Sequence, residues 1–344
     1  MENYYIEGGV PLRGEYRVKG AKNSALPILA ATVCKAGIYE IYDCPRIGDV
    51  FAMVEILEAL GAKIKWEGDC IVVDSREINQ YAVPKHLMSE MRSSVFLMGS
   101  LLVRNQEALI YRPGGCNIGK RPIDIHISGL EQLGFEVYYD EEEIRCKGCC
   151  HGGKGTLPYP SVGATENIIL AAVKAKGITR IYNAAKEPEI EDLQEYINKM
   201  GGNVKEGVDK LDKVEHTVIP DRIAIGTYMV ASAITGGCLE VDKIIRPHME
   251  PINNILIKAG CDIEYTKEGL ILNAPKKIKA INFLKTDIHP NFPTDMQSQM
   301  MALMTISEGN TIFYETIFEN RFMHCGELNK MGANTEIIST HLCR

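Results

Sequence analysis

Residues 23–32, Asn-Ser-Ala-Leu-Pro-Ile-Leu-Ala-Ala-Thr, and residues 163–172, Gly-Ala-Thr-Glu-Asn-Ile-Ile-Leu-Ala-Ala, carry one pattern that repeats 140 positions apart. The match continues without a gap as far as Gly61 and Gly201. In both copies a small apolar helix is followed by a glycine turn, a short β-branched strand and an amphipathic helix. Internal repeats of this kind predict an α/β fold that is built from helix–strand–helix–strand units.

A hydrophobic residue followed by glycine marks the end of each unit. The pair recurs at Leu60-Gly61, Leu133-Gly134, Met200-Gly201, Ala259-Gly260 and Met331-Gly332. Glycine just past a helix adopts the left-handed conformation that ends it, so the sequence predicts five copies of the unit. Because repeats close by symmetry or by capping, five copies suggest two domains of three units, with the sixth unit missing.

Composition limits the classes of function. The chain has 344 residues, 45% hydrophobic and 24% charged, which predicts two or three globular domains. The net charge of -7 argues against nucleic-acid binding, so an anionic ligand needs a local cationic site. The N-terminus shows no signal peptide, and no apolar run is long enough to span a membrane. Eleven cysteines without a signal peptide predict reduced thiols in the cytoplasm.

A Gly-rich loop brings a cysteine close to two cations. Residues 112–126 read Arg-Pro-Gly-Gly-Cys-Asn-Ile-Gly-Lys-Arg-Pro-Ile-Asp-Ile-His. Lys120 and Arg121 would favour the thiolate of Cys116 and would attract phosphate, so an activated thiol next to a phosphorylated substrate is one interpretation. The stretch Gly114–Lys120 also has the spacing of a P-loop, but Arg121 stands where that loop needs a Ser or Thr. An ordinary turn with an incidental cysteine is the third interpretation.

A second group of cysteines has metal-like spacing. Cys146, Cys149, Cys150 and His151 occur within six residues. A structural zinc site usually needs a second pair of ligands at a suitable distance, and none stands out in the sequence. We therefore interpret the group as a surface turn and expect no metal.

Nine spaced motifs carry a resemblance to a known family. They are Gly20-Ala-Lys-Asn-Ser-Ala-Leu-Pro, Met91-Arg-Ser-Ser, Pro113-Gly-Gly-Cys-Asn-Ile-Gly, Arg121-Pro-Ile-Asp-Ile-His, Ser161-Val-Gly-Ala-Thr, Glu187-Pro-Glu-Ile, Pro220-Asp-Arg-Ile, Phe292-Pro-Thr-Asp-Met-Gln and Glu319-Asn-Arg-Phe-Met-His. In this order they resemble the UDP-N-acetylglucosamine 1-carboxyvinyltransferases (enolpyruvyl transferases) of the EPSP synthase-like superfamily. The resemblance runs from Tyr5 to about Ile338.

The resemblance implies a two-domain inside-out α/β barrel, the enolpyruvyl transferase fold. Residues 21–219 would form the first domain, and residues 1–20 plus 220–344 would form the second. The family continues past Arg344 by about one unit that carries an Asp-Leu-Arg motif, so we expect the chain to be C-terminally truncated. It also usually has Glu where this chain has Ala224.

The resemblance also implies roles for individual residues. Cys116 would act as the acid on phosphoenolpyruvate, and Asp295 would be the base at the sugar 3-hydroxyl. The phosphoenolpyruvate would contact Lys22, Arg92 and Arg121. The UDP-N-acetylglucosamine would contact Asn23, Arg121, Pro122, Ile123, Asp124, Ile125, Ser161, Val162, Gly163, Asp295, Ile317 and Arg321.

The chemistry of the reaction agrees with these residue types, because adding a hydroxyl to an enol ether needs an acid, a base and cations for the phosphate. A purely structural alternative for Asp295 is a helix N-cap, since an apolar run begins at Met296.

The expected activity is transfer of the enolpyruvyl group from phosphoenolpyruvate to the 3-hydroxyl of UDP-N-acetylglucosamine, in peptidoglycan precursor synthesis. The resemblance implies no cofactor, no metal, no nucleic-acid or membrane partner, a monomer and a cytoplasmic location. One alternative is a truncated homologue that binds the UDP-sugar without turnover. Another is the shikimate 3-phosphate enolpyruvyl transferase, against which Cys116 and the Arg121–His126 motif argue.

Overall fold

The computed structural model describes residues 5–88, 95–111, 123–202 and 213–344. The described residues divide into two compact units. The first unit holds the residues up to Val18 together with Pro220–Arg344, and the second holds the described residues from Lys19 to Ile219. Each unit buries a hydrophobic core of its own.

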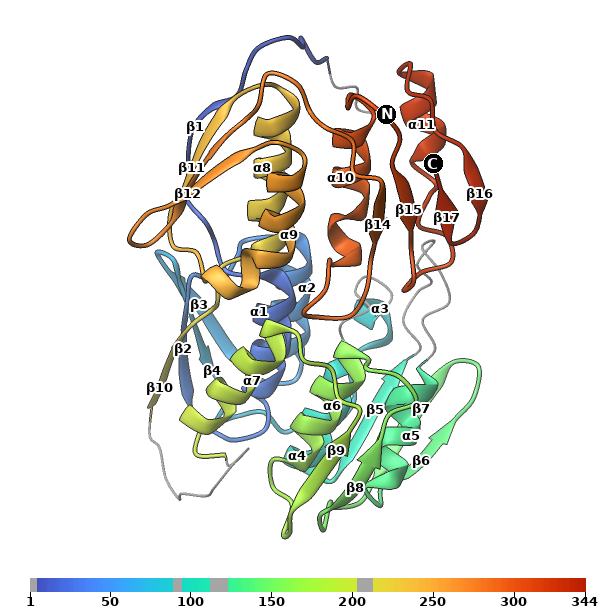
Figure 1. Ribbon diagram of the computed structural model, residues 1–344. Coiled ribbons are helices and arrows are strands. Elements are labelled where there is room, and N and C mark those ends of the chain that lie inside the picture. The colour runs from blue at the N-terminus through green and yellow to red at the C-terminus, as the bar shows by residue number, and fades with distance from the viewer. Residues whose placement is uncertain (1–4, 89–94, 112–122, 203–212) are drawn as a thin grey trace. The chain divides into compact units, whose positions relative to one another are not determined.

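The unit that begins at Lys19 is a mixture of short helices and short strands (Figure 1). Its elements in chain order are α1 (Lys22–Ala31), β2 (Ile38–Tyr42), α2 (Gly48–Ala59), β3 (Lys63–Glu67), β4 (Cys70–Asp74), α3 (Lys85–Met88), α4 (Leu97–Asn105), β5 (Glu107–Tyr111), α5 (Asp124–Gln132), β6 (Glu136–Tyr139), β7 (Glu143–Lys147), β8 (Gly153–Thr156), α6 (Val162–Ala172), β9 (Thr179–Tyr182), α7 (Pro188–Lys199) and β10 (Lys213–Thr217). They form three sheets, in the strand orders β10-β2-β4-β3, β5-β7-β6 and β8-β9.

The predicted repeat is present in the structure. Helix α2 and helix α7 begin and end 140 positions apart, at Gly48 and Pro188 and at Ala59 and Lys199. The structure adds a third strand to the predicted helix–strand–helix–strand unit: β3 pairs with β4 as an antiparallel hairpin, and β6 pairs with β7 in the same way. The strand that follows the first helix also takes a parallel partner from elsewhere in the chain, as β2 does with β10.

The small apolar helices lie at the centre of this unit. Every residue of α1 from Ser24 to Ala31 is buried, and so is every residue of α6 from Ala164 to Ala171. A helix that is apolar on all sides must be covered on all sides, and α1 packs against α2, α4 and α7. Helices inside and sheets outside are the arrangement that the inside-out fold requires.

The unit that ends at Arg344 follows the same plan. Its elements are β1 (Arg13–Tyr16), α8 (Arg222–Ile234), β11 (Cys238–Val241), α9 (Arg246–Lys258), β12 (Asp262–Tyr265), β13 (Leu270–Asn273), β14 (Phe283–Lys285), the 3₁₀ turn η2 (Thr294–Met296), α10 (Gln297–Met304), β15 (Ile312–Tyr314), α11 (Cys325–Lys330), β16 (Ile337–Ser339) and β17 (Leu342–Cys343). The sheets run β1-β11-β13-β12 and β14-β15-β17-β16, and α8 lies between the first sheet and α10 (Figure 1).

The five predicted helix ends are confirmed by the backbone. Gly61, Gly134, Gly201, Gly260 and Gly332 all have positive φ, between 82° and 109°. The prediction of a barrel is corrected in one respect: across the described residues, the five sheets stay separate and do not close on one another. The edge strand β16 leaves Ile337 and Ile338 about half exposed. In the described part of the chain, no helix is both long and apolar enough to cross a bilayer.

Candidate functional site

Four of the predicted site residues lie outside the described residues. They are Arg92, Cys116, Arg121 and Pro122. The P-loop alternative for Gly114–Lys120 falls in the same gap. The remaining predicted residues divide between the two units.

Lys22 and Asn23 occupy the first turn of α1, where both side chains are exposed. The Lys22 Nζ lies 3.0 Å from the Asp49 Oδ2 at the start of α2, and both side chains are a little over 40% exposed. The backbone just before the helix is fixed, because the amide of Ala21 donates to the carbonyl of Ile219 at 2.8 Å. An exposed ammonium on an anchored helix start is suited to hold a phosphate or carboxylate.

A buried polar network supports this helix start from below. Asp192, on α7, accepts a hydrogen bond from the hydroxyl of Ser24, the residue after Asn23. The same carboxylate contacts His216 Nε2 at 2.9 Å and accepts from the amide of Ile219 at 3.3 Å. Both Asp192 and His216 are almost fully buried. The network therefore connects α1, α7 and β10 and holds Lys22 and Asn23 in place.

Helices α5 and α6 bring two of the predicted sugar-nucleotide segments together. Ser161 caps α6, and its Oγ accepts from the amide of Ala164 at 3.4 Å. A Cβ added at Gly163 would lie 3.3 Å from the Cε1 of His126, which places that glycine against the first turn of α5. The predicted Ile123 and Asp124 stand at the start of α5. The described parts of the two motifs are therefore neighbours, as a shared ligand requires.

An acidic group that the sequence had not indicated lies in the second turn of α6. Glu166 is buried, and neither of its carboxylate oxygens has a hydrogen-bond partner among the described residues. Burial raises the pKa of Glu166 well above its ordinary value, and the charges of Glu189 and Glu187 raise it further. Glu187 and Glu189 stand at the start of α7, so the negative charges that raise the pKa of Glu166 come from a second helix.

In the other unit, Asp295 and Arg321 meet directly. The Arg321 Nη2 lies 3.2 Å from Asp295 Oδ1 and donates to the carbonyl of Thr294 at 3.1 Å. The N-cap interpretation of Asp295 is wrong. Pro293 caps η2 and Met296 caps α10, and neither cap uses a side-chain hydrogen bond. The 3₁₀ turn places Asp295 inside the helix start, with its carboxylate toward Arg321.

Ile317, a predicted sugar-nucleotide contact, lies just after β15. Its amide donates to Oε1 of Glu315 at 2.8 Å. The Glu315 carboxylate is completely buried. The ring of Phe318 lies 5.4 Å from the guanidinium carbon of Arg321, which itself contacts Asp295. The three predicted residues of this unit, Asp295, Ile317 and Arg321, therefore belong to one contact network.

Sequence reasoning missed Asp49, Glu166 and Glu315. Glu315 lies only two residues before the predicted Ile317, and Glu166 only three after Gly163. A charged residue inside an apolar segment is the signal that could have identified both, because such residues are rarely buried without a role. Asp49 gives no such signal, since an acid in the first turn of a helix is ordinary.

The cysteines near residue 150 lie in different surroundings. Cys146 is buried on β7 with its sulfur 3.9 Å from that of Met98, and Cys150 is buried 3.9 Å from the hydroxyl of Thr179. Cys149 is exposed. Among the described residues, no three His, Cys, Asp or Glu side chains lie close enough to hold a metal.

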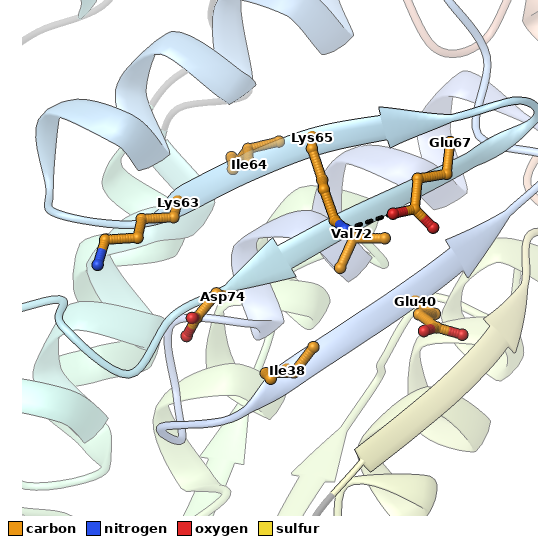
Figure 2. A pocket seen from close by; sticks show the side chains of 8 residues that line it. All are labelled: Ile38, Glu40, Lys63, Ile64, Lys65, Glu67, Val72 and Asp74. Atoms are coloured by element: carbon orange, nitrogen blue, oxygen red, sulfur yellow. Dashed lines mark ion pairs between the residues drawn. The ribbon is translucent and has the colours of Figure 1, made fainter.

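A hollow of about 540 Å³ lies on the open face of β2, β3 and β4. Figure 2 shows the side chains that line it, with the ion pair between Lys65 and Glu67 drawn across it. Lys63 pairs with Glu77 at 2.9 Å and Asp74 with Arg76 at 2.7 Å. Its charged side chains are thus largely paired with one another or with neighbours, and none of the predicted site residues lines it.

Known proteins match this chain over nearly its whole length. The family model described as EPSP synthase (3-phosphoshikimate 1-carboxyvinyltransferase) matches residues 6–343. The UDP-N-acetylglucosamine 1-carboxyvinyltransferase 2 of Caldanaerobacter subterraneus is 48% identical over 98% of this chain and 83% of its own length. The UDP-N-acetylglucosamine 1-carboxyvinyltransferase of Finegoldia magna is 43% identical over 97% of this chain and 82% of its own.

Solved structures support the fold. The enolpyruvyl transferase NikO from Streptomyces tendae superposes with a TM-score of 0.85 at 20% identity, over 98% of this chain and 83% of that one. EPSP synthase from Acinetobacter baumannii superposes with a TM-score of 0.73 at 17% identity, over 98% and 82%. The predicted enolpyruvyl transferase fold is thereby confirmed. The chain belongs to the family of UDP-N-acetylglucosamine 1-carboxyvinyltransferases, within the wider EPSP synthase family.

Proposed function

We propose that this protein transfers the enolpyruvyl group of phosphoenolpyruvate to the 3-hydroxyl of UDP-N-acetylglucosamine and releases phosphate. The observation that carries the proposal is the 48% identity to a UDP-N-acetylglucosamine 1-carboxyvinyltransferase over nearly the whole chain. The two relatives described above favour this acceptor over shikimate 3-phosphate, since both are named UDP-N-acetylglucosamine 1-carboxyvinyltransferases.

The reaction has two steps. In the first, the sugar hydroxyl loses its proton to a base, its oxygen bonds to the enol carbon, and the methylene carbon gains a proton from an acid. In the second, the carbon–oxygen bond to phosphate breaks and the new methyl group loses a proton. Both steps need proton transfer at a fixed position, which a positioned side chain accelerates by about 100- to 10,000-fold.

We assign the base to Asp295. Its carboxylate is 45% exposed, so it is accessible to a hydroxyl, and Arg321 holds one of its oxygens. A carboxylate whose position is fixed by a neighbouring guanidinium is preorganised to accept a proton from a bound sugar. Cys116 is the proposed acid, and it lies outside the described residues.

Among the described residues, Lys22 is the one that we propose to bind the substrate phosphate. Its ammonium stands on the anchored start of α1, beside Asn23, and its ion-pair partner Asp49 is itself partly exposed. A substrate phosphate can therefore replace or join that carboxylate without burying an unpaired charge. Arg92 and Arg121 complete the proposed set.

The sugar nucleotide is proposed to lie along the starts of α5 and α6. Ile123, Asp124 and Ile125 stand at one helix start, and Ser161, Val162 and Gly163 stand at the other. Glycine at position 163 lets the two helix starts approach closely, because an added Cβ would lie 3.3 Å from the Cε1 of His126. Helix starts present free amide groups, which favour the phosphates of a diphosphate.

A phosphate-release assay tests the proposal. Phosphate should appear only when phosphoenolpyruvate and UDP-N-acetylglucosamine are both present, and shikimate 3-phosphate should not replace the sugar nucleotide. Release that is independent of the sugar, or that depends on shikimate 3-phosphate, would refute the assigned acceptor. We also propose a monomeric, cytoplasmic enzyme, which light scattering on the purified chain and fractionation of the cells address.

A further inference from the structure

Glu315 is a buried carboxylate that gathers three hydrogen-bond donors. It follows β15 directly and is completely buried. Its Oε1 accepts from the amides of Ile317 and Phe318, at 2.8 Å and 3.1 Å. Its Oε2 accepts from the hydroxyl of Thr294 at 2.8 Å. A buried carboxylate is costly unless its oxygens are satisfied, and here both of them are.

The three donors belong to two segments that carry proposed site residues. Thr294 immediately precedes Asp295, and Ile317 is itself a proposed contact. Arg321 closes the connection from the other side, because it donates to the carbonyl of Thr294 and to the carboxylate of Asp295. Thr294 is therefore held twice, through its hydroxyl by Glu315 and through its carbonyl by Arg321.

The backbone at Glu315 is itself anchored. Its amide donates to the carbonyl of His341 at 2.9 Å, and its carbonyl lies 2.8 Å from Nδ1 of the same residue. The next residue, Thr316, donates two hydrogen bonds to Thr286, from its amide at 3.2 Å and from its hydroxyl at 2.7 Å. Three segments of the β14-β15-β17 sheet thus fix the position from which the carboxylate reaches out.

We propose that Glu315 is a positioning residue, which sets the place of Asp295 through Thr294 and the place of the 317–321 segment through two backbone amides. The inference rests on the proposed function for its consequence, since it makes Glu315 responsible for the geometry of the base. Glu315 is not a catalytic residue, because it is buried and touches no reacting atom.

Substitutions at Glu315 and Thr294 distinguish the hydrogen-bonding role of Glu315 from the role of its charge. In Glu315→Gln, the amide oxygen still accepts from Ile317 and Phe318, and its NH₂ group can donate to the Thr294 hydroxyl, which turns to accept. In Glu315→Ala, all three donors lose their acceptor. Thr294→Val removes the link to the Asp295 turn alone and keeps the amide contacts.

The first measurement is independent of activity. Amide hydrogen exchange on the unliganded protein should be faster at residues 294–296 and 317–318 in Glu315→Ala, and near the wild-type rate in Glu315→Gln. Glu327→Gln is the matched control, because Glu327 is exposed and pairs with the equally exposed Lys330. Unchanged exchange at these amides in Glu315→Ala would overturn the positioning role, whatever the activity of the chain.

The second measurement is kinetic. A base displaced by about 1 Å loses on the order of 100-fold in rate, so kcat should fall by about that factor in Glu315→Ala, and less in Thr294→Val. Glu315→Gln should restore most of it. Adding Glu315→Ala to Asp295→Asn should cost little more than Asp295→Asn alone, because both changes remove one function.

The outcomes separate the two proposals. A wild-type chain with no turnover on both substrates refutes the proposed function, and the exchange measurement still decides the positioning role. An active wild type whose Glu315→Ala variant keeps its kcat, or whose double variant shows fully multiplied losses, overturns the positioning role and leaves the proposed function standing.

Discussion

The guanidinium of Arg321 holds the carboxylate of Asp295, with 3.2 Å between Nη2 and Oδ1. The Arg321 side chain is 14% exposed and the Asp295 side chain 45% exposed, so the cation is covered while the carboxylate faces outward. This asymmetry suits a pair in which one partner orients the other. It gives the candidate site a fixed acidic residue in the unit that ends at Arg344.

Asp295→Asn should lower kcat by about 100- to 10,000-fold, because the amide cannot accept the proton of the sugar hydroxyl. The fold should persist, since Asn keeps an oxygen for Arg321. Steady-state phosphate release and the melting temperature are the measurements. Glu308→Gln, which changes an exposed acid paired with Lys277, is the control. A variant with near wild-type kcat would remove Asp295 from the role of base.

Lys22→Ala should cost about 100- to 1000-fold in kcat/KM for phosphoenolpyruvate, because one preorganised cation at a phosphate contributes on that scale. Asp49→Asn should change it little, since an exposed ion pair contributes only about 0–1 kcal/mol. Lys19→Ala is the matched control: Lys19 pairs with Asp69 at 3.1 Å and is also exposed. Equal losses in the Lys19 and Lys22 variants would indicate a general charge effect and not a site.

Glu166→Gln should be more stable than the wild type at high pH, and the difference should shrink as pH falls. Burial raises the pKa of Glu166, so the folded state holds its proton more strongly than the unfolded state. Stability is then lost as pH rises from the ordinary glutamate pKa through the folded pKa. Gln carries no such proton. The melting temperature of the variant should exceed that of the wild type at pH 8 and approach it near pH 4. A difference that grows toward acid pH would contradict the assignment.

Cys116 should react with an epoxide phosphonate faster than the other cysteines, because Lys120 and Arg121 follow it by four and five residues in the sequence and cations favour a thiolate. Burial raises the pKa of Cys34 and Cys261 to about 11 and of Cys44 and Cys146 to about 12, so these thiols stay protonated at neutral pH. Peptide mass mapping after a short exposure measures the selectivity.

Two other cysteines serve as controls for that experiment. Cys149 is exposed and reports simple access. A hydrogen bond from Cys343, with 3.6 Å between the two sulfurs, lowers the pKa of Cys325, but this thiol is buried. If Cys149 is labelled as fast as Cys116, the reaction depends only on accessibility. If Cys325 is labelled as fast, it depends only on the fraction of thiolate.

Local patterns predicted much of the fold. The glycines that end the five amphipathic helices require positive φ, and the structure has it at all five. The 140-residue repeat relates α2 to α7, and both ends of the two helices match this spacing without a shift of even one residue. Such features depend on neighbours in sequence. The second strand of each hairpin and the open sheets depend on pairing between distant residues, which no local pattern determines.

The site was predicted less completely, for the same reason. Asp295 was found, but its partner Arg321, which orients the carboxylate, lies 26 residues further on. The proposed role of Glu315 depends on its hydrogen bond with Thr294, which lies 21 residues earlier. Glu166 is unusual only because α6 buries it against the start of α7. Each of these facts is tertiary.

The identity of the product tests the account most directly. The purified chain is incubated with phosphoenolpyruvate and UDP-N-acetylglucosamine, and the sugar nucleotide is analysed by mass spectrometry and NMR. We predict an enolpyruvyl ether at the sugar 3-oxygen, formed in equal amount with phosphate, and its loss in Asp295→Asn. Unchanged sugar nucleotide under conditions in which shikimate 3-phosphate is converted, or an ether on another oxygen, would contradict the account.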